Sequence, residues 1–284
     1  MSIEVRELTH IYSEGLPHES VAIEGVSFSA EDGQLVGVIG HTGSGKSTLM
    51  QHLNGLLKPK SGTIVIGDTD ITASGVVMRD IRRKIGLVFQ YPEYQLFEET
   101  VAKDVAFGPA NLGLSQEEID RRVEEAVEMV GLDYDAVKNV SPFELSGGQK
   151  RRVAIAGVIA MKPEVLILDE PTAGLNPKAH EDILEMVKTI QENEKNIVFL
   201  VSHNMNDIAR MSDKVLVMDH GRLVMEGTPQ EVFSRGEELK AMGLDIPDSM
   251  EIVSRLNKAG MKIEGACLTI DEAADKIAKI IKQG

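Results

Sequence analysis

The sequence predicts an α/β protein that is built around a mostly parallel sheet. Short apolar runs recur along the chain, and segments with helical periodicity separate several of them. These runs, which we take as strands, are residues 35–39, 85–89, 165–168, 197–201 and 215–218. A continuous apolar run of this length is typical of a strand that is buried on both faces of a parallel sheet.

The N-terminal thirty residues have a different pattern. Apolar and polar side chains alternate around Ile3 and Val5, and again from Val21 to Phe28, as they do in half-buried strands. We therefore expect an N-terminal antiparallel β layer beside the parallel sheet. The run at 35–39 is followed by a glycine-rich turn and then by residues 47–57 at helical spacing, which predicts a strand, a loop and a helix.

Strand signals disappear between residues 90 and 162, and this predicts a helical insert. One of its helices is marked by Ser115 and Glu118, which have the spacing of a capping box, and apolar residues at helical spacing follow them. We expect this helical subdomain to lie within a larger domain that spans residues 1–229.

Residues 230–284 are predicted to form a separate, helix-rich tail with a role in dimerisation or regulation. Thr269 and Glu272 have the spacing of a capping box at the start of the last helix. The apolar side chains expected to share one face of that helix are Ile270, Ala274, Ile277 and Ile281.

Composition excludes several classes of function. The chain has 284 residues, of which 42% are hydrophobic and 26% are charged, enough for one large globular unit with an appendage. Its net charge of −15 argues against nonspecific binding to nucleic acid.

We see no secretory signal and no run of the roughly 18 apolar residues that a membrane span requires, so we expect a cytoplasmic protein that reaches membranes only through partners. The single cysteine, Cys267, is expected to serve ordinary packing.

The first chemical motif reads GHTGSGKS over residues 40–47 and lies between an expected strand and an expected helix. Its glycines let backbone N–H groups point at phosphate oxygens, while Lys46 reaches the β- and γ-phosphates and Ser47 offers a hydroxyl to Mg²⁺. The motif therefore predicts a P-loop NTPase core that binds ATP and Mg²⁺. The expected nucleotide-binding residues here are Gly40, His41, Thr42, Gly43, Ser44, Gly45, Lys46, Ser47 and Thr48.

A second motif supplies two carboxylates. The apolar run at 165–168 leads to Asp169 at the end of the sheet, where its carboxylate can hold the Mg²⁺ shell. The adjacent Glu170 is placed to polarise an attacking water as a general base, a role commonly worth about 10²–10⁴ in rate.

A third motif is LSGGQ at residues 145–149, and it leads into a helix. Ser146 and the amides of Gly147 and Gly148, with Gln149, would form a second anion site at that helix N-terminus, suited to a γ-phosphate. This string is the signature of ABC ATPases, which the chain resembles up to about residue 230. The resemblance implies a head-to-tail dimer, because in that family the signature faces the nucleotide held by the opposite subunit.

The resemblance also implies roles for single residues. Gln90 matches the glutamine that contacts Mg²⁺ and the attacking water, and His203 matches the histidine that contacts the γ-phosphate. Tyr12 resembles the aromatic residue that stacks on adenine. The chain departs from the family at Asn176, where an aspartate normally ends the dimer-contact loop, so communication across the dimer would be damped or tuned.

The string FQYPEYQLF at residues 89–97, with AFGP at 106–109, looks like the ATPase A subunits of energy-coupling factor (ECF) transporters, and most like the second A subunit of the pair. These subunits drive uptake of vitamins and transition-metal ions. We expect a transmembrane coupling subunit to dock near four large side chains, with the substrate-binding membrane subunit contacted only indirectly. The four are Tyr91, Tyr94, Leu96 and Phe97. The alternative is that they form the core that joins the insert to the sheet.

Three other functions use the same motifs. A soluble ABC ATPase would normally carry two cassettes or a long coiled coil, and neither is present. A scaffolding subunit with a degenerate site is opposed by the complete set of catalytic candidates. A conventional importer or exporter would use the same chemistry. Only the string at residues 90–97 and the tail distinguish this chain from the ATPase subunit of such a transporter. The cargo stays open because an ATPase subunit does not touch it, and the second ATPase subunit is either another copy or a related chain.

Overall fold

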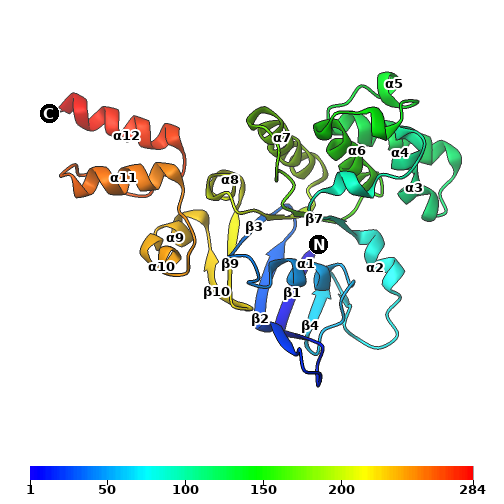
Figure 1. Ribbon diagram of the computed structural model, residues 1–284, viewed down its shortest axis with the longest axis horizontal. Coiled ribbons are helices and arrows are strands. Elements are labelled where there is room, and N and C mark those ends of the chain that lie inside the picture. Colours follow the sequence, from blue (N-terminus) through cyan, green and yellow to red (C-terminus); the bar gives the residue numbers. More distant parts are fainter. Residues whose placement is uncertain (284) are drawn as a thin grey trace.

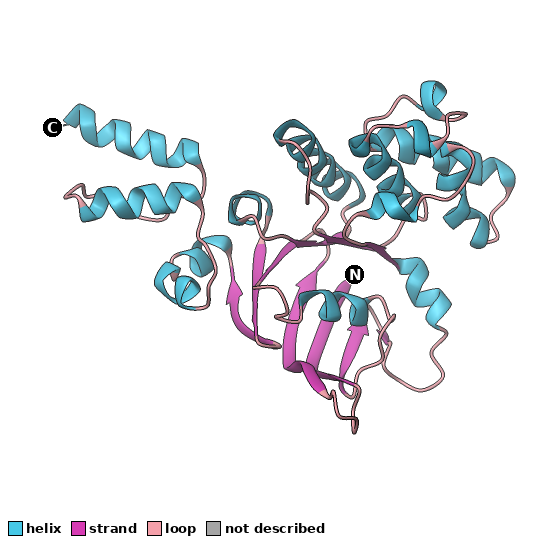
Figure 2. Ribbon diagram, viewed as in Figure 1, coloured by secondary structure: helices cyan, strands magenta, loops and turns pink. Residues whose placement is uncertain are grey.

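The computed structural model describes residues 1–283, and Figures 1 and 2 show its layered arrangement. A six-stranded sheet runs through the body in the order β10-β9-β3-β8-β7-β6. Its strands are β3 (Leu35–Ile39), β6 (Ile85–Val88), β7 (Val165–Asp169), β8 (Ile197–Val201), β9 (Lys214–Asp219) and β10 (Arg222–Gly227). All pairs are parallel except β9 with β10, so the expectation of a mostly parallel sheet is confirmed. Every residue of β3, β7 and β8 is buried, which explains their continuous apolar runs.

The expected N-terminal antiparallel layer is also present. A four-stranded sheet has the order β2-β1-β4-β5, with antiparallel pairing throughout. Its strands are β1 (Ser2–Tyr12), β2 (Ser20–Glu31), β4 (Ser61–Ile66) and β5 (Thr69–Asp70). One core cluster joins its inner face to the parallel sheet, and Phe28 meets Phe199 edge-on there with ring centroids 6.1 Å apart.

Helices cover the parallel sheet on both faces. Helix α1 (Lys46–Leu53) packs between the two sheets, and α2 (Met78–Lys84) leads into β6. Helices α7 (Pro177–Glu194) and α8 (Met205–Met211) pack with the insert against the opposite face. Helix α1 is shorter than expected, because the chain leaves helical geometry at Asn54 rather than at residue 57.

The segment after β6 is helical, as expected. It contains η1 (Pro92–Gln95), α3 (Val101–Asn111), α4 (Gln116–Met129), α5 (Tyr134–Val137), η2 (Pro142–Glu144) and α6 (Gly147–Ile159). Helices α3, α4 and α6 pack against one another and appear as the green lobe in Figure 1. No residue between Gln90 and Met161 is assigned to a strand.

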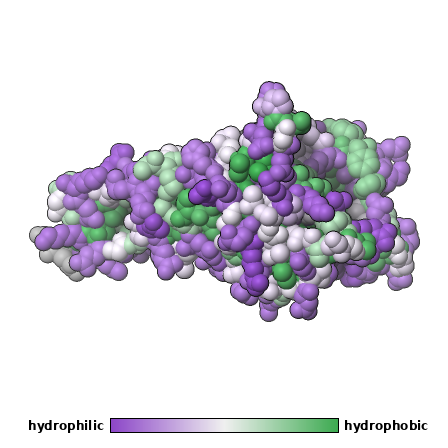
Figure 3. Space-filling model, turned by 90° about the horizontal axis from the view of Figure 1, so that it is seen from below, coloured by the Kyte–Doolittle hydropathy of each residue, from purple (hydrophilic) through white to green (hydrophobic). Residues whose placement is uncertain are grey.

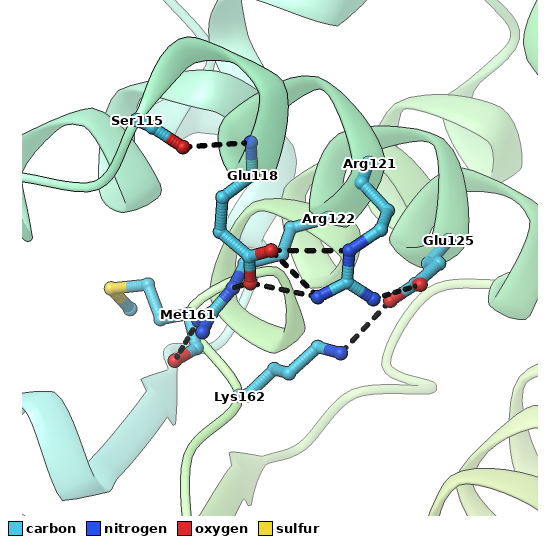
Figure 4. Close-up of polar contacts among 7 residues, drawn as sticks. All are labelled: Ser115, Glu118, Arg121, Arg122, Glu125, Met161 and Lys162. Carbon is cyan, nitrogen blue, oxygen red and sulfur yellow. Dashed lines mark hydrogen bonds and ion pairs between the residues drawn. The ribbon is translucent and has the colours of Figure 1, made fainter.

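The expected capping box on α4 is only half correct. The Ser115 hydroxyl accepts a hydrogen bond from the Glu118 N–H at 3.3 Å, but the Glu118 carboxylate turns away from Ser115. It binds Arg121 at 2.7 Å and Arg122 at 2.6 Å, as Figure 4 shows. Arg122, and then Arg121, lowers the pKa of Glu118 to about 2. Two charge-assisted partners displace the reciprocal bond to the cap, because each is stronger than a neutral amide bond.

The tail begins at α9 (Pro229–Phe233) and continues through α10 (Gly236–Ala241), α11 (Asp248–Lys258) and α12 (Ile270–Gln283). Helices α11 and α12 lie side by side and project from the body as an arm (Figure 1). They enclose a small core of their own, whose buried members are Val253, Ile263, Cys267 and Ala273. Two hydrogen bonds of 2.9 Å tie Asp248 at the start of α11 to Asn206 on α8. The division at residues 229 and 230 stays a prediction.

The expected apolar stripe on α12 is wrong in part. Ile277 packs onto the small core, whereas Ile270 and Ile281 are 66% and 64% exposed and Ala274 is exposed as well. The inward face instead uses Ala273 and Ile280, one position away from the expected set. The Thr269 hydroxyl caps the Glu272 N–H at 3.2 Å, but the Glu272 carboxylate accepts from the Leu268 N–H rather than from Thr269.

The face shown in Figure 3 is mainly hydrophilic, with separate hydrophobic patches, and the arm is narrower than the body. Among the helices of residues 1–283, none is long and apolar enough to cross a membrane.

Candidate nucleotide-binding and catalytic site

The loop between β3 and α1 needs its glycines. Gly40, Gly43 and Gly45 have φ angles of 153°, 83° and 100°, which side chains rarely adopt. A Cβ atom at Gly40 would lie 2.3 Å from the Met218 carbonyl oxygen, and one at Gly45 would lie 2.6 Å from that of Ala22. The loop therefore wraps tightly against β9 and β2, and its helix begins with Lys46.

Lys46 is buried beneath this loop. Its Nζ donates hydrogen bonds to the carbonyl oxygens of Gly40 at 2.6 Å and of His41 at 3.0 Å. Burial lowers the pKa of Lys46, while the nearby Glu170 and Asp169 carboxylates act in the opposite direction. The Lys46 ammonium group therefore lies between the phosphate-binding loop and the carboxylates of Asp169 and Glu170.

A cavity of about 480 Å³ opens beside the loop. It brings together residues from six separate parts of the chain. The lining residues are Tyr12, Ser20, Val21, Ala22, Thr42, Gly43, Gly45, Lys46, Ser47, Thr48, Gln90, Asp169, Glu170 and His203. Every catalytic and metal-binding candidate from the sequence lies on this cavity.

The two acids lie at the carboxyl end of β7. Burial raises the pKa of Asp169, and a hydrogen bond from Ser47 opposes this. Burial, and then the Asp169 charge, raises the pKa of Glu170 to about 7. Glu170 has a φ of 54°, a conformation that non-glycine residues usually adopt only where the surrounding structure imposes it. Its N–H donates to the Val201 carbonyl oxygen at 3.0 Å, which fixes the backbone there.

His203 lies close to Glu170. Its Nε2 atom is 3.0 Å from Glu170 Oε1, although the angle does not make a hydrogen bond. The Glu170 side chain is only 13% exposed, so Oε1 is a buried acceptor that lacks a hydrogen-bond partner among the described residues. Burial lowers the pKa of His203, and the charge of Lys46 adds to this effect. Oε1 can therefore still accept a hydrogen bond from a bound water.

Gln90 and Tyr12 flank the acids. The sequence predicted a strand over residues 85–89, but β6 ends at Val88 and Gln90 follows in a loop at the cavity. The Tyr12 hydroxyl is 3.3 Å from the Thr48 hydroxyl, and its ring meets His10 edge-on at 4.5 Å. Tyr12 is 40% exposed, so one side of its ring remains available to a flat ligand.

The signature residues lie elsewhere. Ser146 caps α6, and its backbone N–H donates to Gln149 Oε1 at 3.1 Å, which completes a capping box. Ser146 and Gly147 are exposed, and the cavity described above is lined by none of residues 146–149. The segment predicted to form a second anion site thus lies on the surface of the insert and outside this cavity.

Comparison with known proteins decides the family. Residues 23–173 match the family model described as ABC transporter. The chain is 55% identical over 283 residues to the energy-coupling factor transporter ATP-binding protein EcfA2 of Clostridioides difficile (strain 630), a match that covers 99% of this chain and 98% of that protein. The protein of the same name in Clostridium tetani is 52% identical over 280 residues, or 99% and 97% of the two chains.

The chain belongs to the ATP-binding proteins of energy-coupling factor transporters. It is therefore an ABC-type ATPase, and the predicted fold class, family and enzymatic activity are confirmed.

Solved structures agree with this assignment. The structure of cbiO1 from Clostridium perfringens, part of the ABC transporter complex cbiONQ, has a TM-score of 0.76 and 37% identity, and covers 90% of this chain and 98% of that one. The dimeric structure of MJ0796, a bacterial ABC transporter cassette, has a TM-score of 0.70 and 31% identity, and covers 80% and 98%.

Within this ECF ATP-binding chain, sequence reasoning missed one important residue. Arg151 on α6 is almost fully buried and binds the Glu93 carboxylate with two bonds of 2.7 and 3.0 Å. It also donates to the carbonyl oxygens of Pro171 and Ala173, at 3.0 and 2.7 Å. Arg151 thus joins the segment after Gln90 to the loop after Glu170. The sequence does not reveal this ion pair because Arg151 and Glu93 lie 58 residues apart.

Asn176 has a structural role that the sequence did not reveal. It caps α7, where its Oδ1 accepts a hydrogen bond from the Ala179 N–H at 3.0 Å. Asparagine and aspartate serve this position about equally well, so the substitution keeps the start of the helix while it removes a charge from the loop.

Proposed function

We propose that this chain hydrolyses ATP in a Mg²⁺-dependent reaction and thereby drives an ECF importer of vitamins or transition-metal ions. It would act as a peripheral subunit at the cytoplasmic face of the cell membrane, held there by membrane partners. The observation that carries the proposal is the convergence of Lys46, Gln90, Asp169, Glu170 and His203 on one cavity beside the phosphate-binding loop.

The residues fit a bound Mg²⁺. The Ser47 hydroxyl, the Asp169 carboxylate and the Gln90 side-chain oxygen are the hard oxygen ligands that Mg²⁺ prefers, and all three residues line the cavity. When bound with ATP, the ion would supply charge neutralisation at the β- and γ-phosphates. Lys46 and the loop amides would bind the same phosphates, Tyr12 would stack on the base, and His203 would contact the γ-phosphate.

Glu170 is the proposed general base. A water would attack the γ-phosphorus, a bond would form between its oxygen and phosphorus, and the bond to the β-γ bridging oxygen would break to release ADP. The proton from the water would pass to Glu170 Oε1, which accepts no other hydrogen bond. A carboxyl whose pKa is about 7 is matched to such a transfer at neutral pH.

A complete site would need two ATPase subunits. Ser146 and Gly147 are exposed and Gly148 is partly exposed at the N-terminus of α6, where they could bind a γ-phosphate held by a partner. The partner is a second copy of this chain or a related A subunit, arranged head to tail. MJ0796 has been solved as a dimer in a post-hydrolysis state with ADP and Pi, which supports a dimeric arrangement here.

The transmembrane coupling subunit would dock beside η1. Tyr91, Tyr94 and Phe97 are 41%, 84% and 56% exposed, whereas Leu96 is buried in the core of the insert. A mainly apolar groove of about 370 Å³ begins at Phe97 and is also lined by Phe107. The exposure of these three rings favours docking over the alternative that all four side chains form core. Leu96 is the one of the four that is buried in the core.

The test is Glu170→Gln. This variant should bind ATP but hydrolyse it at least about 10²-fold more slowly, and it should accumulate as an ATP-bound dimer. Glu192→Gln, at an exposed position on α7, is the matched control and should keep the parental rate. Steady-state phosphate release by Glu170→Gln at nearly the parental rate would overturn the assignment.

A further inference from the structure

A cluster of two histidines and an aspartate lies next to the phosphate-binding loop but does not line the nucleotide cavity. His41 belongs to the loop before α1, while Asp219 and His220 form the turn between β9 and β10. One ligand atom from each residue lies within 4.8 Å of the other two. Nothing in the hydrolysis mechanism uses the imidazole groups of His41 or His220.

Both ring nitrogens of His41 face hydrogen-bond acceptors. Nδ1 lies 2.8 Å from the Thr42 carbonyl oxygen, which can only accept, so a hydrogen bond there places the ring proton on Nδ1. Nε2 is then a bare lone pair, yet it lies 3.0 Å from Asp219 Oδ1, which is another acceptor. Two lone pairs at this distance need a positive charge between them.

No lysine or arginine supplies that charge. Arg222, the next charged residue of the turn, binds Glu24 at 2.8 Å. Among the described residues, the ion pairs of the Asp219 carboxylate are to His41 at 3.0 Å and to His220 at 3.9 Å. An imidazolium-carboxylate pair would account for His41 and Asp219 alone, whereas His220 brings a third ligand atom within 4.8 Å of both.

We propose that His41, Asp219 and His220 bind a divalent first-row transition-metal ion, of the class of Zn²⁺, Co²⁺ and Ni²⁺. Two imidazoles and one carboxylate are the ligand set that these ions take in preference to Mg²⁺ or Ca²⁺. Two atoms bound to one ion at about 2.1 Å lie roughly 3–4 Å apart, which is the spacing that Asp219 already has to both histidines. The bond from Nδ1 to a backbone carbonyl is the contact that commonly orients a metal-binding histidine.

The site would hold the phosphate-binding loop against the β9-β10 turn. The Gly221 N–H already donates to the Ser44 carbonyl oxygen at 3.0 Å, so the two segments are in contact before any ion binds. His220 has a φ of 43° and a side chain that is 83% exposed, in a turn position where asparagine is also well tolerated. His220→Asn therefore removes a ligand while it keeps the turn.

The test is Co²⁺ binding by the metal-stripped, nucleotide-free chain, followed by visible absorption and by calorimetric titration. One ion should bind per chain and should raise the melting temperature. His220→Asn and Asp219→Asn should each weaken binding at least about tenfold. His18→Asn, which removes an exposed histidine between β1 and β2, should leave the affinity unchanged.

Three results would overturn the proposal. The parental chain could show no saturable binding, which would leave a proton as the group between His41 and Asp219. Binding could be equally strong in His220→Asn and the parental chain, which would locate the ion elsewhere. It could also weaken as much in His18→Asn as in His220→Asn. Circular dichroism checks that each variant is folded, and the exposed His220 variant decides the result if Asp219→Asn does not fold.

Discussion

At the scale of single residues, Glu170 makes the stability of the chain depend on pH. Its pKa in the folded chain, about 7, lies above its ordinary value of 4.5. The protonated side chain is therefore favoured by folding, and this contribution is complete below pH 4.5 and is lost as the pH rises through 7. Above pH 7 the ionised carboxylate lies in a buried site beside Asp169 and opposes folding.

Glu170→Gln should therefore stabilise the nucleotide-free chain at pH 8, by an amount on the order of 1–2 kcal/mol once solvent screening is allowed for. The gain should almost vanish at pH 4.5, where the parental residue is itself largely neutral. Urea denaturation of both proteins at the two pH values measures the difference. A gain of the same size at both pH values would contradict the ionisation as its cause.

The residue scale is also where the sequence was most informative. The loop at 40–47 and the acids at 169 and 170 are contiguous motifs, so their chemistry can be read before the fold is known. Arg151 and Glu93 form a pair only because α6 packs against η1. A buried ion pair between distant segments leaves no local pattern in either segment.

At the scale of single elements, η1 and the segment that follows it expose Tyr94 and Phe97 to solvent. Replacing both with alanine should cost the isolated subunit little stability, because most of the Tyr94 ring and more than half of the Phe97 side chain are exposed. The double variant should keep ATP binding but lose association with the membrane partner and uptake of cargo. Loss of two anchoring aromatic residues typically costs several kcal/mol of binding free energy, which a pull-down detects.

Leu16→Ala is the control for this variant, since Leu16 is 61% exposed on a loop at the other sheet. It should leave the pull-down unchanged. If the Tyr94 and Phe97 variant folds and still supports full transport, the docking surface lies elsewhere.

Helix α12 gives a second prediction at this scale. Ile270 and Ile281 are exposed on the outer face of the arm, so replacing both with serine should leave the monomer folded. The variant should weaken nucleotide-free dimerisation while it spares ATP binding, because we expect this face to hold two ATPase subunits together when the catalytic sites are open. Sedimentation analysis measures the change, and an unaltered dimer would count against the tail as the contact.

The elements show why helix faces and ends are hard to predict. The period of α12 was correct, but its inward face is rotated by one position, because only packing against α11 selects Ala273 and Ile280 over Ala274 and Ile281. The cap at Ser115 was correct, but Glu118 has arginine partners one turn further along the helix that compete for its carboxylate. Local spacing therefore predicts where a helix forms. Contacts with other parts of the fold decide which face is buried and which partners its charged side chains bind.

At the scale of the whole molecule, the phosphate-binding loop and Ser146 lie in different regions of one chain. If two copies form a dimer, a Lys46→Ala chain mixed with a Ser146→Ala chain should regain one intact composite site. ATPase activity of the mixture should exceed that of either variant alone. No recovery on mixing, together with activity when a related A subunit is added, would show an obligate heterodimer.

The two-sheet architecture followed from the sequence because buried parallel strands and half-buried antiparallel strands have different patterns. Strand β10 was not predicted, since its residues alternate only weakly and its pairing with β9 depends on the tight turn at His220 and Gly221.

The small core of the arm also allows motion of the arm to be measured through a natural thiol. Cys267 is the only thiol in the sequence and is fully buried in that core, so a thiol reagent can react only when the packing around it opens. Its rate of labelling should therefore measure opening of the arm without an introduced probe. We expect labelling to become slower when a second ATPase subunit is added, and a rate that is independent of the partner would mean that the arm is equally closed in both states.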